Sequence, residues 1–245
     1  MVLGGYNMYR YKNQSGIALL MVLMLLIIIG AVAASSIRLA STGLNNASFS
    51  MANSLIQKEN DVALFHLIDY GLIDDKIKPL GVLGYPVANP GKEIVFCMGV
   101  NPRTSLFSST SVSHIFWTTS TRPTGSEVGS KGYCKSASST FTSGRKAIMT
   151  QVSIRYDNTR TAAQFTGVAG VTGKVMVAHA TSIMPSLGDS TNAKIDACLS
   201  NYMSAPEVSP KFATASENDK RTISECLDDE HVPNKTTTST FLIAE

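Results

Sequence analysis

An uncharged apolar run near the amino terminus limits what this chain can fold into more than any other feature. From Ile17 to Ile37 there are 21 residues without a charged side chain, in the order IALLMVLMLLIIIGAVAASSI. As a helix, such a run is long enough to cross a hydrocarbon layer of about 30 Å. The segment before it contains Arg10 and Lys12 and no acid. Basic residues beside an apolar span stay in the cytoplasm, so the sequence predicts a membrane anchor with the rest of the chain on the other side.

The start of this run is also a candidate processing site. A secretory leader normally has its small-residue cleavage site after the apolar core. In this chain the small residues Ser15 and Gly16 stand before the core, and Ile-Ala-Leu-Leu follows at once. This junction resembles the class III signal peptide of type IV prepilins. The resemblance implies cleavage by a prepilin peptidase between Gly16 and Ile17, methylation of the new amino terminus at Ile17, and retention of the apolar helix on the mature protein.

Two other interpretations of the run remain open. Ala31, Val32 and Ala33 form an A-x-A-like triplet, as in a removable secretory signal, and the run also fits an uncleaved signal anchor. The residues that follow favour the prepilin interpretation, because residues 35–70 contain no proline and one glycine, Gly43.

Apolar residues recur in that stretch at helical spacing, which predicts one buried helix face. They are Leu44, Ala47, Met51, Leu55, Val62 and Phe65, and the stem of Lys58 can fill the gap between them. Gly71 is a natural end for the helix. We therefore expect one continuous helix over 17–71, with a membrane-spanning first half and an amphipathic second half.

Four cysteines follow the apolar run: Cys97, Cys134, Cys198 and Cys226. An even number of cysteines in an exported region indicates disulfides, and four cysteines allow three pairings. We favour pairing of sequence neighbours, Cys97 with Cys134 and Cys198 with Cys226. No CxxC pair exists and no histidine is close to a cysteine in the sequence, so a zinc site is not expected.

The region after residue 71 has the pattern of a globular domain with a β-sheet. Runs typical of strands occur at 93–98, 112–119, 147–156, 174–184 and 238–244. The run 147–156 alternates as a half-buried strand does, and 174–184 resembles a strand buried on both faces. Residues 192–203 have helical spacing, 79–91 predict a loop, and 217–230 form a charged segment. We expect an α+β fold in which the second half of the helix packs on an antiparallel sheet, with a leader at 1–16, the helix at 17–71 and a head at 72–245.

Motifs for catalysis are missing from the sequence. Residues 167–174 superficially follow a phosphate loop, but that pattern needs a glycine at Val168 and a hydroxyl at Val175, so we expect a turn between two strands. Ser126 is one position away from a GxSxG pattern. No HExxH-type pair is formed by the histidines, which are His66, His114, His179 and His231. We expect no enzyme activity and no cofactor.

Charged residues give no sign of a metal site or a nucleic-acid site. Asp228, Asp229 and Glu230 are a weak calcium candidate, but three consecutive acids cannot all face one ion, so a solvated turn is favoured. The formal net charge is +3, and two of the positive charges precede Gly16, which leaves +1 for the remainder. Such a near-neutral chain has no basic groove for nucleic acid, so we expect neither a metal nor a nucleic-acid partner.

The segment from Gly16 to Tyr70 carries a closer resemblance. A leucine-rich span is followed by Met51-Ala52-Asn53-Ser54 and then by Asp61-Val62-Ala63-Leu64. Together these resemble the N-terminal part of PilX-type minor pilins of type IV pili. The resemblance implies a pilin-like fold in which the membrane and assembly helix includes Leu19, Leu20, Met21, Leu23, Leu25 and Gly30.

One departure from that family is informative. Most pilins have a glutamate four residues beyond the new amino terminus, and this chain has Met21 there. In the family that carboxylate is understood to pair with the terminal amine of the subunit assembled before it, and an unpaired carboxylate in a bilayer is costly. A leading subunit has no such amine to meet. Met21 therefore predicts a position at or near the filament tip.

The functional expectation is a minor pilin that primes pilus assembly or sits at the filament tip. It would be held first in the bacterial inner membrane with a periplasmic head. The expected partners are the other minor pilins, the major pilin, the prepilin peptidase and, through the head, a host or surface ligand, with roles in adhesion and twitching motility. The alternatives are a tip pseudopilin of a type II secretion system, which also lacks the glutamate, and a signal-anchored periplasmic enzyme or binding protein.

Overall fold

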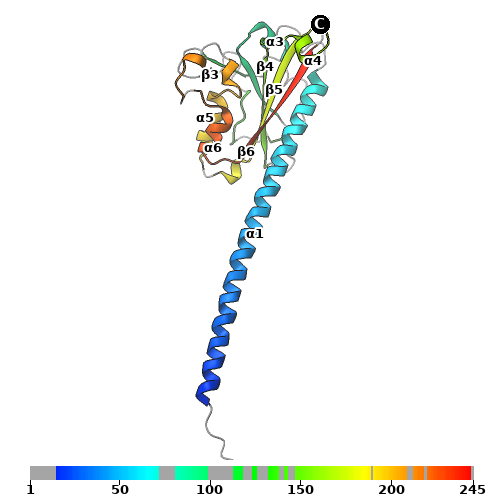
Figure 1. Cartoon of the computed structure of the whole chain (residues 1–245). Helices are drawn as coiled ribbons and strands as arrows, with labels where there is room; N and C mark the ends of the chain where they lie inside the picture. Colours follow the sequence, from blue (N-terminus) through cyan, green and yellow to red (C-terminus); the bar gives the residue numbers. More distant parts are fainter. Residues whose placement is uncertain are drawn as a thin grey trace, which may run out of the picture. The chain divides into compact units, whose positions relative to one another are not determined.

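The computed structural model describes residues 15–71, 81–98, 113–117, 123–125, 132–137, 141–142, 147–188, 190–208, 212–217 and 220–243. The chain divides into two compact units, Met1–Met51 and Ala52–Glu245. Helix α1, Ser15–Gly71, contributes its first part to the first unit and its last part, from Ala52, to the second (Figure 1). The expected continuous helix is therefore confirmed.

The second unit contains an antiparallel sheet whose strand order among the described residues is β3-β2-β1-β4-β5-β6. The strands are β1 (Glu93–Met98), β2 (Ser113–Trp117), β3 (Pro123–Gly125), β4 (Met149–Tyr156), β5 (Lys174–Ile183) and β6 (Asn234–Ile243). Each of the five predicted runs contains a strand, and the α+β class is confirmed. The last strand begins at Asn234 rather than at 238, because the threonines that follow Lys235 pair along β5. Strand β3 was not predicted.

Helix α1 covers one face of this sheet within the second unit. Its buried residues there recur at spacings of three and four, which places them on one side of the helix. They are Ala52, Ile56, Asn60, Ala63, Leu64 and Leu67. Leu64 and Leu67 belong to an apolar core with residues of β1, β4 and β5, among them Phe96, Ile154 and Met176. We refer to this side of the sheet as the first face.

The buried side of α1 is not the one that the spacing of large apolar residues predicted. Met51 and Phe65 are 64% and 68% exposed, and Leu44 and Val62 are exposed as well. The buried residues lie between one and two positions further along the chain than the predicted ones, a rotation of about 150°. Small or polar residues such as Ala52, Asn60 and Ala63 face the sheet and let the helix approach it closely. We term the exposed residues of the predicted side the outer stripe: Leu44, Met51, Val62 and Phe65.

The opposite side of the sheet, which we term the second face, has a core of its own. Helices between β5 and β6 contribute to this core. Helix α5 (Asn192–Asn201) and helix α6 (Ile223–Asp229) supply Ile195, Leu199, Ile223 and Leu227 to a core with Met149 and Ile183 of the sheet. Two 3₁₀ turns, η4 (Pro206–Val208) and η5 (Phe212–Thr214), lie between these helices in the chain. Helix α5 confirms the helical spacing at 192–203, but α6 was not predicted within the charged segment.

Strand β4 corrects one prediction, because it is buried on both faces rather than half-buried. Its polar residues on the second face have partners inside the protein. The side-chain amide of Gln151 donates to the carbonyl of Leu199 at 2.8 Å, and the Ser153 hydroxyl donates to the Ser204 hydroxyl at 2.8 Å. Strand β5 is buried on both faces, as predicted.

Short helical segments occur where the sequence predicted no helix. Helix α3 (Gly84–Ala88) lies within 79–91, and a 3₁₀ turn, η3 (Pro185–Leu187), follows β5. Helix α4 (Ala162–Thr166) begins with a capping box formed by Thr161 and Gln164. It ends at Gly167, whose φ of 71° is a left-handed conformation that glycine adopts without strain. The glycine-rich segment 167–174 therefore links a helix to a strand, which corrects the predicted turn between two strands.

Candidate functional site

The first candidate site is the apolar part of helix α1 in the first unit. Its large apolar side chains from Ile17 to Leu39, including Leu19, Leu20, Met21, Leu23 and Leu25, are 55–74% exposed. Within the described part of the chain, this is the one helix long and apolar enough to cross a membrane, judged by length and composition. A helix that is apolar all round belongs in lipid or against other proteins. This finding is consistent with the expected single-pass anchor.

Hydroxyl groups in this helix do not interrupt its apolar character. Ser35 donates its hydroxyl proton to the carbonyl of Ala31 at 2.8 Å, and Ser36 donates to that of Val32 at 2.9 Å. A hydroxyl that bonds to the preceding turn leaves no donor unsatisfied in a hydrocarbon layer. The apolar span can therefore include both serines and extend to Arg38.

The glycines of this helix are not required by packing within the chain. A Cβ atom added at Gly16, Gly30 or Gly43 would meet no atom within 4 Å. Glycine at Gly16 therefore has no explanation in the fold itself, and the same holds for Gly30.

Two disulfides fix the second unit. Cys97 at the end of β1 is bonded to Cys134, and Cys198 of α5 is bonded to Cys226 of α6. This is the pairing that the sequence favoured. Cys97, Cys134 and Cys198 are buried in the core of the second face, and Cys226 packs against it. One bond thus joins the segment 132–137 to β1, and the other joins α6 to α5.

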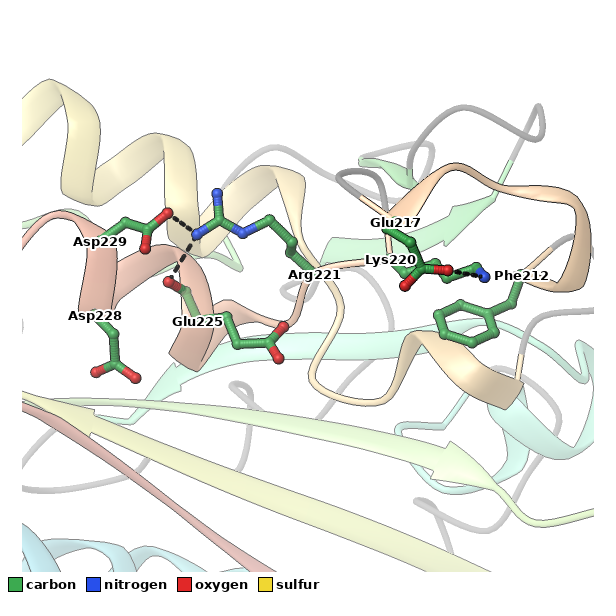
Figure 2. A pocket seen from close by; sticks show the side chains of 7 residues that line it. All are labelled: Phe212, Glu217, Lys220, Arg221, Glu225, Asp228 and Asp229. Carbon is green, nitrogen blue, oxygen red and sulfur yellow. Dashed lines mark hydrogen bonds and ion pairs between the residues drawn. The ribbon is translucent and has the colours of Figure 1, made fainter.

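A charged hollow of about 680 Å³ lies beside α6 (Figure 2). Its lining residues are Phe212, Glu217, Lys220, Arg221, Glu225, Asp228 and Asp229. Figure 2 shows Phe212, Glu217 and Lys220 on one side and Arg221, Glu225 and Asp229 on the other. With four acidic and two basic side chains, the lining has a net formal charge of −2.

Both cations of the charged hollow are engaged by groups of the hollow itself. Lys220 pairs with Glu217 at 2.8 Å, and its nitrogen lies 5.2 Å from the centre of the Phe212 ring. Arg221 pairs with the carboxylate of Asp229 and also donates to the backbone carbonyl of Glu225 at 3.0 Å. The side chain of Glu225 closes a capping box with Thr222 at the start of α6. These pairs build the walls of the hollow and leave no unengaged cation in it for an anion.

The three acids of the weak calcium candidate, Asp228, Asp229 and Glu230, each contact different partners in the structure. Asp228 accepts from the side chain of Asn234 at 2.7 Å, and Asp229 pairs with Arg221. Glu230 accepts from Ser190 at 2.5 Å and from Lys194 at 2.9 Å. Hydrogen bonds from Ser190 and Lys194 lower the pKa of Glu230. Asp228 and Asp229 belong to the last turn of α6, so the predicted solvated turn begins only at Glu230. No group of three metal-binding side chains occurs in the described ranges.

A set of buried ionisable groups that the sequence did not reveal lies on the second face. Strand register places Glu93 of β1, Arg155 of β4 and His179 of β5 on that face, because side chains alternate along each strand. The carboxylate of Glu93 is fully buried and accepts the backbone N–H groups of Ser204 at 2.8 Å and Ala205 at 2.7 Å. An acid at the first position of the apolar strand EIVFCM was the available signal.

Burial shifts the pKa values of two of these groups in opposite directions. It raises the pKa of Glu93 to about 7, against the lowering effect of the two N–H groups and of the Arg155 charge. Burial, followed by the charge of Arg155, lowers the pKa of His179 to about 4. The Nδ1 atom of His179 lies 2.9 Å from the Thr238 hydroxyl, whereas its Nε2 atom and the Nε atom of Arg155 are buried without a hydrogen-bond partner.

The other histidines of the sequence belong to other elements. His66 belongs to α1, where its ring centre is 6.2 Å from that of Phe65. His231 follows α6 with a φ of 54°, and its Nδ1 atom is 3.2 Å from the carbonyl of Asp228. His114 is a residue of β2, and Ser126 lies outside the described residues.

No family model, no curated protein and no solved structure matches this chain. The functional argument therefore depends on the sequence and on the geometry described above.

Proposed function

We propose that this chain is a minor pilin of a type IV pilus, processed by prepilin peptidase between Gly16 and Ile17. One observation carries the proposal. A single helix starts at the Ser15–Gly16 junction, is apolar and exposed through the first unit, and continues until it packs on the sheet of the second unit. A removable leader needs no such continuation. A pilin uses the same helix first as an anchor and then as the element by which subunits pack.

Exposed apolar side chains beyond the membrane span support this use. Leu39 and Phe49 are exposed, as is the whole outer stripe. Water-exposed apolar surface of this extent is unfavourable unless a partner covers it. We assign these residues to contacts with the helices of other minor pilins and of the major pilin, and this arrangement supports the proposed pilin-like class.

Met21 supports a position at the leading end of the filament. It lies in the exposed apolar part of α1, where a carboxylate would have no partner within this chain. In the proposal, the chain primes assembly or occupies the tip, so the amine that would neutralise a glutamate at this position is absent. The head is then free to meet a host or surface ligand, whose chemistry we leave open.

Mass spectrometry of the mature amino terminus tests the proposal. We expect an N-methylated Ile17. A Gly16→Val variant should retain residues 1–16, and a Gly43→Val variant is the matched control, because an added Cβ meets no atom at either position. A mature protein that starts at Met1 or near Ala34 would contradict the proposal, as would normal processing of the Gly16→Val variant.

A tip pseudopilin of a type II secretion system is the second candidate, and two observations keep it in view. Met21 is equally compatible with it, because that pseudopilin also lacks the glutamate. Such pseudopilins carry a helical insertion in the head, which the composition did not suggest, whereas the structure has helices α5 and α6 between β5 and β6. Deletion of the gene separates the two candidates. Loss of surface pili and of twitching supports the pilin, whereas loss of protein secretion with normal pili supports the pseudopilin.

A further inference from the structure

Residues 203–205, which we term the root segment, join three parts of the second unit. The root segment follows α5 and precedes η4. The first amide of α6, that of Ile223, donates to the carbonyl of Met203 at 3.1 Å. Met203 and Ala205 are buried, and Met203 packs in a core with Val95 of β1. The position of the root segment on the sheet therefore also fixes the start of the helix that lines the charged hollow.

The carboxylate of Glu93 is the principal polar anchor of the root segment. It accepts two successive N–H groups, from Ser204 and Ala205. The hydroxyl of Ser153 adds a bond to that of Ser204. Glu93 makes no ion pair with any described residue, although its side chain is fully buried. An ionised carboxylate in such a place loses its hydration without forming an ion pair at contact distance, and the more distant charge of Arg155 offsets only part of this loss, which destabilises the closed arrangement.

We propose that Glu93 makes the seating of the root segment sensitive to pH, so that protonated Glu93 keeps residues 203–205 on the sheet and ionised Glu93 favours their release. In the protonated form, one carboxyl oxygen still accepts an N–H group and no charge is buried. Release brings water to the carboxylate. Because Ile223 is bonded to Met203, the release reaches α6 and the charged hollow beside it.

The sign follows from linkage between protonation and opening. With the root segment seated, burial raises the pKa of Glu93 to about 7, whereas a hydrated glutamate has its ordinary value near 4.5. Between these values the seated form binds more protons than the released form, so rising pH favours release. Arg155 of β4 lowers the pKa of Glu93, and Glu207 of η4 raises it. In the seated form, burial lowers the pKa of His179 of β5 to about 4, so His179 stays neutral there above pH 5.

Hydrogen exchange of the full-length chain in detergent micelles tests the inference. After correction for intrinsic exchange, protection of the amides of Ser204 and Ala205 should fall by about tenfold or more between pH 5 and pH 8. In the Glu93→Gln variant, protection should not depend on pH, because the side chain is neutral throughout. In the Ser153→Ala variant, which removes a bond without a titrating group, protection should be lower but keep the pH dependence.

Two results would overturn the inference. One is corrected protection that is constant from pH 5 to pH 8 in the native sequence, and the other is an unchanged pH dependence in Glu93→Gln. If that variant does not fold, infrared spectroscopy of the native sequence with labelled glutamate replaces it. A buried carboxyl band that disappears near pH 7 supports the inference, and the absence of any such band above pH 5 refutes it.

Discussion

Asn60 of helix α1 donates from its Nδ2 atom to the backbone carbonyl of Lys235 in β6, at 2.8 Å. The same nitrogen lies 3.2 Å from the hydroxyl of Thr237. Asn60 is fully buried, and it is the polar member of an otherwise apolar helix side. This contact ties the helix to the edge strand of the sheet and explains why a polar residue occupies the centre of the buried side.

Replacement of Asn60 by alanine should lower the free energy of unfolding by about 1–3 kcal/mol, because the carbonyl of Lys235 loses a donor and a cavity remains. Asn53 is the matched control, since it lies on the same helix with an exposed side chain, and Asn53→Ala should change stability by less than about 0.5 kcal/mol. Chemical denaturation followed by circular dichroism measures both. Equal effects of the two substitutions would contradict the assigned contact.

Leu67 and Phe65 distinguish the two sides of α1. Leu67 is fully buried against the sheet, so Leu67→Ala should lower the free energy of unfolding by about 2–5 kcal/mol. Phe65 is exposed, so Phe65→Ala should leave stability nearly unchanged. If the outer stripe contacts other subunits, Phe65→Ala should nevertheless reduce the number of pili counted on cells. Normal piliation with the Phe65 variant would remove this residue from the proposed interface.

The disulfide between Cys198 and Cys226 should be a large contributor to stability. Its removal in a double alanine variant should lower the free energy of unfolding by about 3–4 kcal/mol in the chain-entropy model, because the two cysteines are 28 residues apart. Denaturant titrations of the variant and of the native sequence, both without reductant, give the difference. A loss below about 1 kcal/mol would show that contacts between α5 and α6 suffice without the bond.

His179 should make the protein less stable at acid pH. Burial lowers its pKa in the folded state to about 4, below its ordinary value of 6.5. The unfolded chain therefore binds more protons between these values, so the contribution of His179 is complete above pH 6.5 and is lost as the pH falls through about 4. In His179→Asn this part of the pH dependence should disappear, and thermal unfolding between pH 4 and pH 7 measures the difference. Parallel curves for the two proteins would contradict the shift.

The broad architecture could be predicted because its determinants are local in sequence. The apolar run of Ile17–Ile37 and the absence of proline after it specify the helix, and short β-branched runs specify most strands. Pairing of neighbouring cysteines keeps each closed loop short. None of these inferences required knowledge of which segments meet in space.

The buried side of α1 and helix α6 of the second face were not predicted, because the residues that specify them are not large apolar ones. Counting bulky apolar residues selected the side with Phe65, whereas close approach to the sheet needs small residues such as Ala52 and Ala63. The start of α6 was readable from the T-x-x-E pattern of Thr222 and Glu225, and acidic residues later in the segment obscured it. An acid in the apolar run EIVFCM was a local signal for Glu93, but its partners, the backbone N–H groups of Ser204 and Ala205, are over a hundred residues away and no local pattern could show them.

The disulfides hold one part of this chain together and leave helix α1 outside that part. Both disulfides join elements that come after α1, and the last part of α1 is held on the sheet by side chains such as Ile56 and Leu67 and by Asn60. A force that pulls on the helix is therefore resisted, between the helix and the sheet, by non-covalent contacts and by no disulfide. Under tension the last part of α1 should detach from the sheet, while the elements joined through Cys97, Cys134, Cys198 and Cys226 keep their structure.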